Sequence, residues 1–174
     1  YFPHHHAFRY RRSLRPNDAS AWTPEIQFGE QLTYPTLVCG ADDTLYLTAR
    51  RSWQDKPWTV EMWQKPGEKT WEPVGTLLSS RAKGYSHFQE SLAWDTRHRV
   101  LHLSCRFHEN RGATEVVGYM KSDDLGRTWQ RRDGSIIPGP ATTETIDAIA
   151  VGGRSEGKLS HKCGTIAVDA DGHP

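Results

Sequence analysis

The sequence has few cysteines, no long apolar run and almost no net charge. Its three cysteines, Cys39, Cys105 and Cys163, are widely spaced and include no CxxC pair, so no zinc site is indicated and buried free thiols are expected. No window of eighteen apolar residues exists, and residues 1–20 contain no apolar signal-peptide core. Lys plus Arg number 22 against 21 for Asp plus Glu, a balance that gives no general attraction to nucleic acid or to a membrane.

Arginines are clustered near the start of the sequence, and tryptophans are numerous. A basic run near the start is either a solvated face or anion contact within the fold, or a patch for a polyanion; it consists of Arg9, Arg11, Arg12 and Arg15. The seven tryptophans suit the packed layers of an all-β protein, and they also suit the faces of sugars. Most apolar runs are about four to eight residues long and are separated by Gly, Pro, Asp and Lys, which predicts short strands and no amphipathic helix.

The chain repeats itself. The segment YSHFQESLAWD (85–95) aligns with LSHKCGTIAVD (159–169), because Ser, His, an apolar-Ala-apolar triplet and Asp coincide. QLTYPTLVCG (31–40) fits the same frame more weakly, and its continuation places Arg50 over Arg106. Further along, WTVEMWQKPGEKTWEPVG (58–75) corresponds to EVVGYMKSDDLGRTWQRRDG (115–134). The repeats predict a unit of four strands.

These four strands, A to D in chain order, recur at a period of about 50 residues, which is typical of a β-propeller blade. A sandwich would not repeat its turns in this way. The expected strands are A at 33–39, 88–94 and 162–168, B at 44–51 and 99–107, C at 58–64 and 115–121, and D at 70–75 and 128–132. The predicted organisation is the outer part of a preceding blade (1–30), a complete blade (31–84), a second complete blade (85–135), an insertion loop (136–158) and the start of the next blade (159–174).

Two complete blades do not close a propeller, which needs roughly four to eight. The all-β chain is therefore expected to be a partial propeller of about three blades' worth, from a protein of six or seven antiparallel, four-stranded blades. The remaining blades would then be its partners in the fold, and its true N-terminus would lie outside this sequence.

The stretch SDDLGRTW (122–129) has a recognisable pattern, formed by Ser122, Asp124, Gly126, Thr128 and Trp129. This pattern resembles the Asp-box, or BNR repeat, of the sialidase-like propeller superfamily. The wider frame over about residues 30–174 is similar to the bacterial BNR-repeat family that includes propeller-type polysaccharide lyases such as ulvan lyases. The neighbouring carboxylates Asp123 and Asp124 are thus expected to be structural: Asp124 accepts hydrogen bonds inside the turn, Gly126 permits a positive φ and Trp129 packs against the blade edge.

Antiparallel connectivity separates the two ends of each blade. The A-B and C-D hairpins lie at one end, so the starts of strands A and the ends of strands B meet at the other. The candidate catalytic residues at that second end are His87, His161 and Tyr85, and the candidate substrate-binding residues are Arg50, Arg106 and His108. Histidine titrates near neutral pH, and an arginine fork matches a carboxylate. The alternative is that these side chains only bridge neighbouring blades.

The resemblance to lyases implies β-elimination at a uronate in an anionic polysaccharide or oligosaccharide. By analogy, His87 would be the base or carboxylate neutraliser, His161 or Tyr85 its partner, Arg106 the carboxylate clamp and His108 a supporting contact. The resemblance also implies a secreted or periplasmic enzyme. Two alternatives stay open: a sialidase-type glycosidase, for which FRYRRS (8–13) lacks the expected Arg-Ile-Pro signature, and a non-catalytic propeller that binds glycans or proteins.

The remaining histidines are not expected to be at the site. His4, His5 and His6 lie in an apparent strand and cannot all face one metal; His98 and His173 lie in A-B turns, and His102 lies in the middle of strand B. No cofactor is expected, and no ligand cluster supports the structural or charge-neutralising metal that the resemblance would permit. The segment 136–158 is expected at the site end, either as a specificity loop or as a long surface loop.

Overall fold

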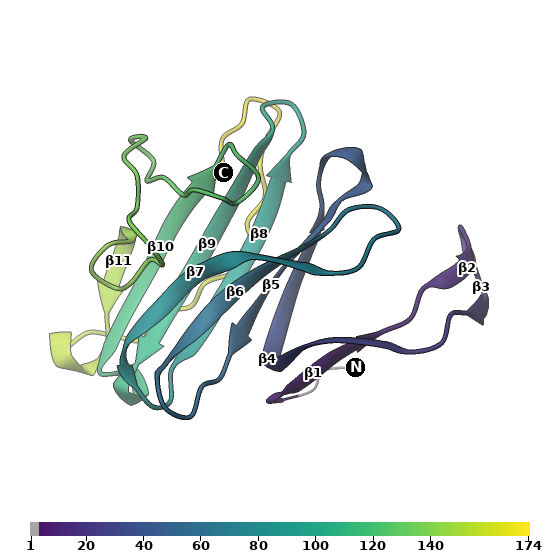
Figure 1. Ribbon diagram of the computed structural model, residues 1–174. Helices are drawn as coiled ribbons and strands as arrows, with labels where there is room; N and C mark the ends of the chain where they lie inside the picture. Colours follow the sequence, from purple (N-terminus) through teal and green to yellow (C-terminus); the bar gives the residue numbers. More distant parts are fainter. Residues whose placement is uncertain (1–3) are drawn as a thin grey trace.

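A computed structural model describes residues 4–174, which form an all-β protein of two main antiparallel sheets (Figure 1). The first sheet has the order β1-β4-β5-β6-β7 and the second the order β11-β10-β9-β8. The first sheet consists of β1 (His6–Tyr10), β4 (Ile26–Cys39), β5 (Leu45–Arg51), β6 (Pro57–Lys65) and β7 (Glu72–Lys83). The second consists of β8 (His87–Asp95), β9 (Val100–Glu109), β10 (Thr114–Ser122) and β11 (Asp147–Gly152).

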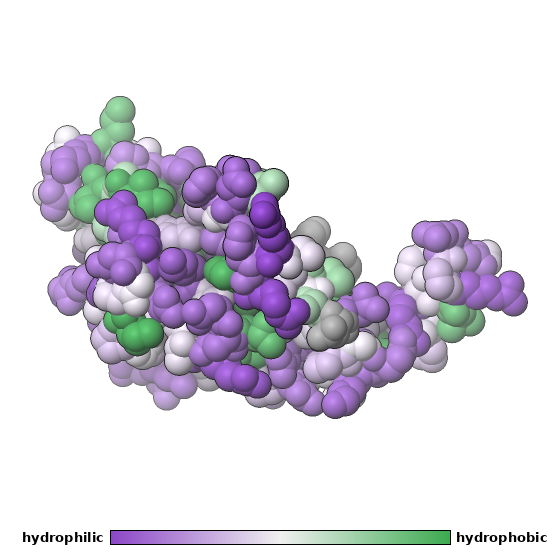
Figure 2. All heavy atoms as spheres, turned by 90° about the horizontal axis from the view of Figure 1, so that it is seen from above, coloured by the Kyte–Doolittle hydropathy of each residue, from purple (hydrophilic) through white to green (hydrophobic). Residues whose placement is uncertain are grey.

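Two short strands and three 3-10 turns complete the described residues. A small hairpin of β2 (Ser13–Arg15) and β3 (Asp18–Trp22) stands away from the sheets in Figures 1 and 2. Three single 3-10 turns follow β4, β9 and β11; they are η1 (Ala41–Asp43), η2 (Asn110–Gly112) and η3 (Arg154–Glu156). Among the described residues, no helix has the length and apolar character needed to cross a membrane.

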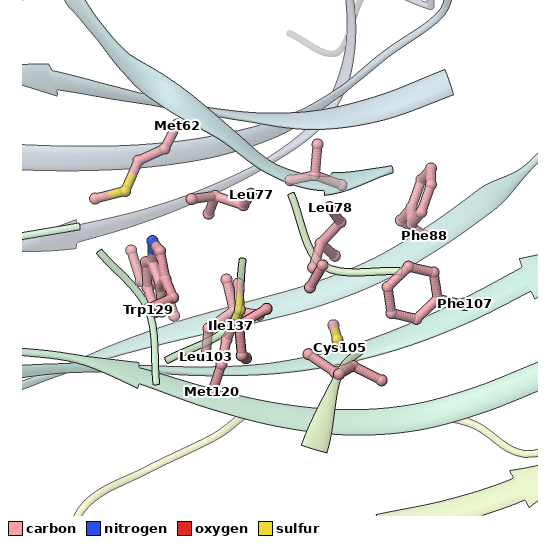
Figure 3. Close-up of a cluster of buried hydrophobic side chains, with 14 of the residues drawn as sticks. Met62, Leu77, Leu78, Phe88, Leu103, Cys105, Phe107, Met120, Trp129 and Ile137 are labelled. Carbon is pink, nitrogen blue, oxygen red and sulfur yellow. The ribbon is translucent and has the colours of Figure 1, made fainter. Parts of the chain in front are cut away.

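The two sheets pack face to face as neighbouring blades of a partial propeller. Alternate residues of each strand point into the space between the sheets, where Met62, Leu78, Phe88 and Phe107 are almost completely buried (Figure 3). Burying one such side chain stabilises the fold by about 1.5–3 kcal/mol. The inner strands β4 and β8 meet directly, since the Thr36 hydroxyl donates to the Glu90 carbonyl at 3.0 Å.

The predicted position of the fourth strand of the second blade is wrong. Residues 128–132 form only a bridge at Gln130, and the place beside β10 is taken by β11, at Asp147–Gly152, inside the segment expected to be an insertion loop. The reason is the preceding turn: residues 123–141 fold back over the core, where Trp129 and Ile137 are buried. The chain therefore reaches the outer edge of the sheet about fifteen residues later than the repeat predicts.

The blade boundaries also differ from the predicted ones. Strand β4 runs through residue 31, and β1 pairs with its first half from Tyr10↔Ile26 to His6↔Leu32, so this part of residues 1–30 extends the first sheet. The expected strand A at 162–168 is extended chain without a strand assignment, held against β8 by bonds such as Ile166 N–H to the Ser91 hydroxyl. Cys105 and Cys163 are buried as expected, whereas Cys39 is exposed.

The 122–129 turn is held by its own side chains. Asp124 accepts from the Thr128 backbone N–H at 2.9 Å and from the Thr128 hydroxyl at 2.7 Å, and the Ser122 hydroxyl donates to it at 2.8 Å. Gly126 has φ +88, and a Cβ there would lie 2.6 Å from the Met62 sulfur of the first sheet. The glycine is therefore required by conformation and by close packing between the blades.

Candidate functional site

A cleft of about 510 Å³ opens between the inner strands β4 and β8, toward the end of the blades where β5 and β9 finish. This is the lower end of the molecule in Figure 1, opposite the β4-β5 and β8-β9 hairpins. The cleft is lined by Tyr34, Pro35, Thr36, His87, Phe88, Gln89, Glu90 and Lys162. Both blades and the segment after β11 thus contribute to one concave surface.

Tyr34 is placed in the cleft by an irregularity of β4. The register with β5 shifts between Thr33 and Thr36, and Tyr34 has φ +56, a left-handed conformation that is unfavourable for a large aromatic residue. The bulge turns the Tyr34 ring toward β8, where it meets the His87 ring edge-on with 5.4 Å between centroids. Strain of this kind persists where the surrounding structure supports it and is concentrated at functional sites.

Arg50 lies beneath this aromatic surface. Only 1% of its surface is exposed, and its guanidinium carbon is 4.9 Å from the ring centroids of both Tyr34 and Trp58. Burial lowers the pKa of Arg50, and the hydroxyls of Tyr34 and Tyr85 partly oppose this shift. The Tyr85 ring in turn contacts Trp58 at 5.3 Å. Arg50 therefore supplies a fixed positive charge behind a layer of aromatic rings.

His87 is the titratable side chain in the cleft best suited to accept a proton. Its pKa is lowered to about 4, mainly by burial and then by the positive charges of Arg50 and Arg106, with smaller contributions from His108 and Lys162. The imidazole is consequently neutral at pH 7 and carries a free lone pair. Lys162, also in the cleft, is exposed and provides a cation at its mouth.

Arg106 does not reach the cleft, so the expected carboxylate clamp is not in position. Its side chain is 3% exposed, and its Nη2 donates to the Glu115 carboxylate at 2.7 Å and to the Ser160 hydroxyl at 3.2 Å. His108 Nδ1 lies 2.7 Å from the same Glu115 oxygen. Although burial raises the pKa of Glu115, the hydrogen bonds from His161 N–H, His108, Ser160 and Arg106 hold it at about 2.

His161 belongs to the same buried network and not to the cleft. Its backbone N–H donates to Glu115 at 2.8 Å, and its ring lies beside Gly152, with Nε2 at 3.4 Å from the Val151 carbonyl oxygen. The proposed trio of His87, His161 and Arg106 therefore does not open onto one surface. Of the other candidates, His108 is close to the cleft, with its ring 6.5 Å from that of His87.

Several residues at the cleft were not predicted. Tyr34 could have been found by its place in the first copy of the YSHF template, whereas Glu90 and Lys162 carry no signal in the sequence. His4 and His5, expected away from the site, contact it: the His4 ring lies 5.0 Å from Tyr34 and the His5 ring 5.6 Å from Trp58. Burial and the charge of Arg50 lower the pKa of His5.

Glu90 is buried at the floor of the cleft, with 9% of its surface exposed. Within the described residues, neither of its carboxylate oxygens has a hydrogen-bond partner. Burial raises the pKa of Glu90 to about 8, although the nearby charge of Arg50 opposes this rise. The side chain is therefore a neutral carboxylic acid at pH 7, next to a buried cation.

The other histidines lie where strand alternation and the turns place them. His102 is buried, with Nδ1 at 2.7 Å from the Tyr119 hydroxyl, and His98 closes the β8-β9 turn through Asp95 at 2.7 Å. Across residues 4–174, one group of side chains has the spacing of metal ligands: Asp169, Asp171 and His173. This group is exposed in a turn that packs beside the β8-β9 hairpin, at the end of the blades opposite the cleft.

Comparison with known proteins identifies relatives of this fold. None of the curated proteins compared with the chain matches it. Two similar solved structures are of a PL25 ulvan lyase, one of them bound to -[GlcA(1-4)Rha3S]-; each has a TM-score of 0.73 and 17% identity. The match covers 98% of this chain and 42% of the lyase chain, so it shows a shared fold over less than half of the neighbour's length. The family model of a BNR repeat-containing family member matches residues 1–174, and the chain therefore belongs to the BNR repeat-containing family.

Proposed function

We propose that this chain forms part of a polysaccharide lyase that cleaves a uronate-containing polysaccharide by β-elimination, in a secreted or periplasmic enzyme. The observation that carries the proposal is His87, a histidine with a pKa of about 4, in a cleft beside the Tyr34 ring and the Lys162 ammonium group. The similar fold of an ulvan lyase, whose bound ligand contains a uronate, supports the same reaction class.

The reaction needs three groups. A cation lowers the charge on the uronate carboxylate, which acidifies the neighbouring C5 proton; Lys162 at the cleft mouth and Arg50 behind the rings provide positive charge. Neutral His87 accepts the C5 proton, and the electron pair forms the C4–C5 double bond as the C4–O bond breaks. The departing oxygen takes a proton from a tyrosine hydroxyl, and Tyr34 is the tyrosine that contacts His87. Proton exchange with solvent then returns His87 to its neutral form and the tyrosine to its protonated form.

The assignments differ from the expected ones for Arg106 and His161, which stabilise the blade through Glu115. Tyr85 remains a candidate proton donor or sugar contact, since its ring is 55% exposed and packs on Trp58. A sialidase-type hydrolase needs several arginines exposed to one carboxylate, whereas Arg50 and Arg106 are both buried. Neither of these two arginines is therefore placed to bind the carboxylate of a sialoside.

The test is to incubate the full protein with ulvan and with other uronate polymers, and to follow the ultraviolet absorbance of the unsaturated uronate. Absorbance should rise with the wild-type protein and with His98→Ala, because His98 lies in the distant β8-β9 turn. It should not rise with His87→Ala. Release of sialic acid from a sialoside without any absorbance change would overturn the lyase assignment, and retention of the polymers without either signal would indicate a binding protein.

A further inference from the structure

A second cleft, of about 440 Å³, lies beside the first at the same end of the blades. It is lined by Ala82 and Lys83 from the end of β7, by Tyr85 and Ser86 from the link to β8, and by Glu109, Asn110, Arg111 and Thr114 from the turn between β9 and β10. The first cleft begins at His87, directly after these link residues. The two clefts are therefore consecutive, running from the inner strands to the outer strands.

Tyr85 is the side chain between them. Its ring is 55% exposed and contacts Trp58 at 5.3 Å, and Trp58 covers the same Arg50 guanidinium that Tyr34 covers. Two aromatic pairs, His87 with Tyr34 and Trp58 with Tyr85, thus lie on either side of the Arg50 guanidinium. Exposed aromatic faces of this kind suit the apolar faces of sugar rings.

The second cleft carries two positive charges that the fold does not use. The side chains of Lys83 and Arg111 form neither a hydrogen bond nor an ion pair within the part of the chain that the structure describes. Arg111 projects from a strained turn, in which Asn110, Arg111 and Gly112 have φ values of +47, +54 and +82. The left-handed conformation is unfavourable for Arg111, whereas asparagine and glycine adopt it readily, and strained residues of this kind are concentrated at functional sites.

The one acidic side chain in this cleft does not neutralise these cations. Glu109 is 8% exposed, and its Oε1 accepts the backbone N–H of Arg81 at 3.1 Å. Burial raises the pKa of Glu109, and even a fully charged Glu109 is outnumbered by the Lys83 and Arg111 cations. The second cleft is therefore partly enclosed and has more positive than negative side chains, and its Tyr85 belongs to the aromatic group that surrounds Arg50.

We propose that the second cleft is a subsite for another anionic sugar unit of the polysaccharide whose uronate lies at His87, with Lys83 and Arg111 binding its acidic group and Tyr85 contacting its ring. The inference rests on the proposed function, because it places that function's substrate across both clefts. The acidic group recognised is a carboxylate or a sulfate ester, since both accept charge-assisted hydrogen bonds from Lys and Arg.

The test combines Lys83→Gln with Arg111→Gln in the full protein and measures kcat and KM on uronate oligosaccharides of increasing length. For substrates long enough to reach the second cleft, KM should rise about tenfold with kcat unchanged, as expected when uniform binding is lost. The shortest cleaved oligosaccharide should be unaffected. The matched control is Lys69→Gln with Arg127→Gln, which removes the same charge from exposed positions at the hairpin end and should change neither constant.

Affinity electrophoresis with desulfated polymers and with carboxyl-reduced polymers separates the two ligands, since a polymer without carboxylates cannot undergo elimination and is compared by binding. Only removal of the recognised group should abolish the difference in retardation between the double variant and wild type. An equal KM for long substrates in the double variant and the wild type would overturn the subsite while leaving the lyase assignment intact. If no polymer is cleaved, the proposed function fails, and the subsite is tested separately by affinity electrophoresis in gels containing each polymer. Retardation lost in the Lys83 and Arg111 variant but not in its control would then support the subsite, and equal retardation would refute it.

Discussion

Glu90→Gln should be more stable than the wild-type protein, by a margin that grows as the pH rises. The Glu90 carboxyl has a pKa of about 8 in the folded protein, raised by burial from 4.5, and its oxygens have no partner among the described residues. Between pH 4.5 and 8 the folded protein therefore holds a proton that the unfolded chain has released, so its stability falls as the pH rises. One pKa unit corresponds to about 1.4 kcal/mol, which gives a cost of about 3 kcal/mol at pH 7.

Glutamine has the same shape and does not ionise, so the variant should escape this cost. Urea unfolding of both proteins from pH 4 to pH 9 measures the difference, which should be close to zero at pH 4 and about 3 kcal/mol in favour of the variant at pH 7. Glu72→Gln, at an exposed position on β7, should show no such trend. Parallel pH profiles for wild type and Glu90→Gln would refute the argument, because they would mean that the Glu90 carboxyl is hydrated or paired.

Three further changes test other parts of the structure. Asp124→Ala removes the acceptor of three hydrogen bonds and should lower the free energy of unfolding, measured with urea, by about 2 kcal/mol. The control is Asp123→Ala, because the contacts of Asp123 to Gln130 are 3.3 Å or longer; it should change the free energy of unfolding by less than about 0.5 kcal/mol in the same assay. Glu115→Gln leaves the buried Arg106 charge uncompensated and should cost about 3–5 kcal/mol at pH 7. That cost should shrink as the pH falls through 4.5 toward 2, where the wild-type carboxylate is itself protonated; a cost independent of pH would contradict the ion pair. For the proposed lyase, the His87 pKa places the acidic limb of kcat/KM near pH 4, and a limb near pH 6.5 would contradict a buried, neutral base.

The repeat predicted the strands well because their alternating burial leaves a local pattern. The seven strands from β4 to β10 lie at the positions that the repeat predicts. The 122–129 turn holds Asp124 through local hydrogen bonds that the spacing of its residues already implies. The fourth strand of the second blade was missed because the repeat gives its position only if the intervening loop has its usual length. Here residues 123–146 pack over the core before β11 begins, and nothing local records that path.

The site was only partly predictable for the same reason. His87 and His161 were predicted from equivalent places at the starts of strands A, and Arg106 from its place at the end of strand B, equivalent to that of Arg50. Equivalence fails because Glu115, on the neighbouring strand β10, binds Arg106 and the His161 backbone, a long-range pairing that no repeat encodes. Tyr34 reaches the cleft through a bulge, and Glu90 lies at its floor through the contact between blades, so both depend on tertiary structure.

The masses of the cleavage products test the central claim most directly. Elimination breaks the C4–O bond without adding water, so the two products of one cleavage should together have the mass of the substrate. We predict this result for the full protein acting on a uronate oligosaccharide of defined length, and no products for His87→Ala. Products whose combined mass exceeds that of the substrate by one water would show hydrolysis and would contradict it.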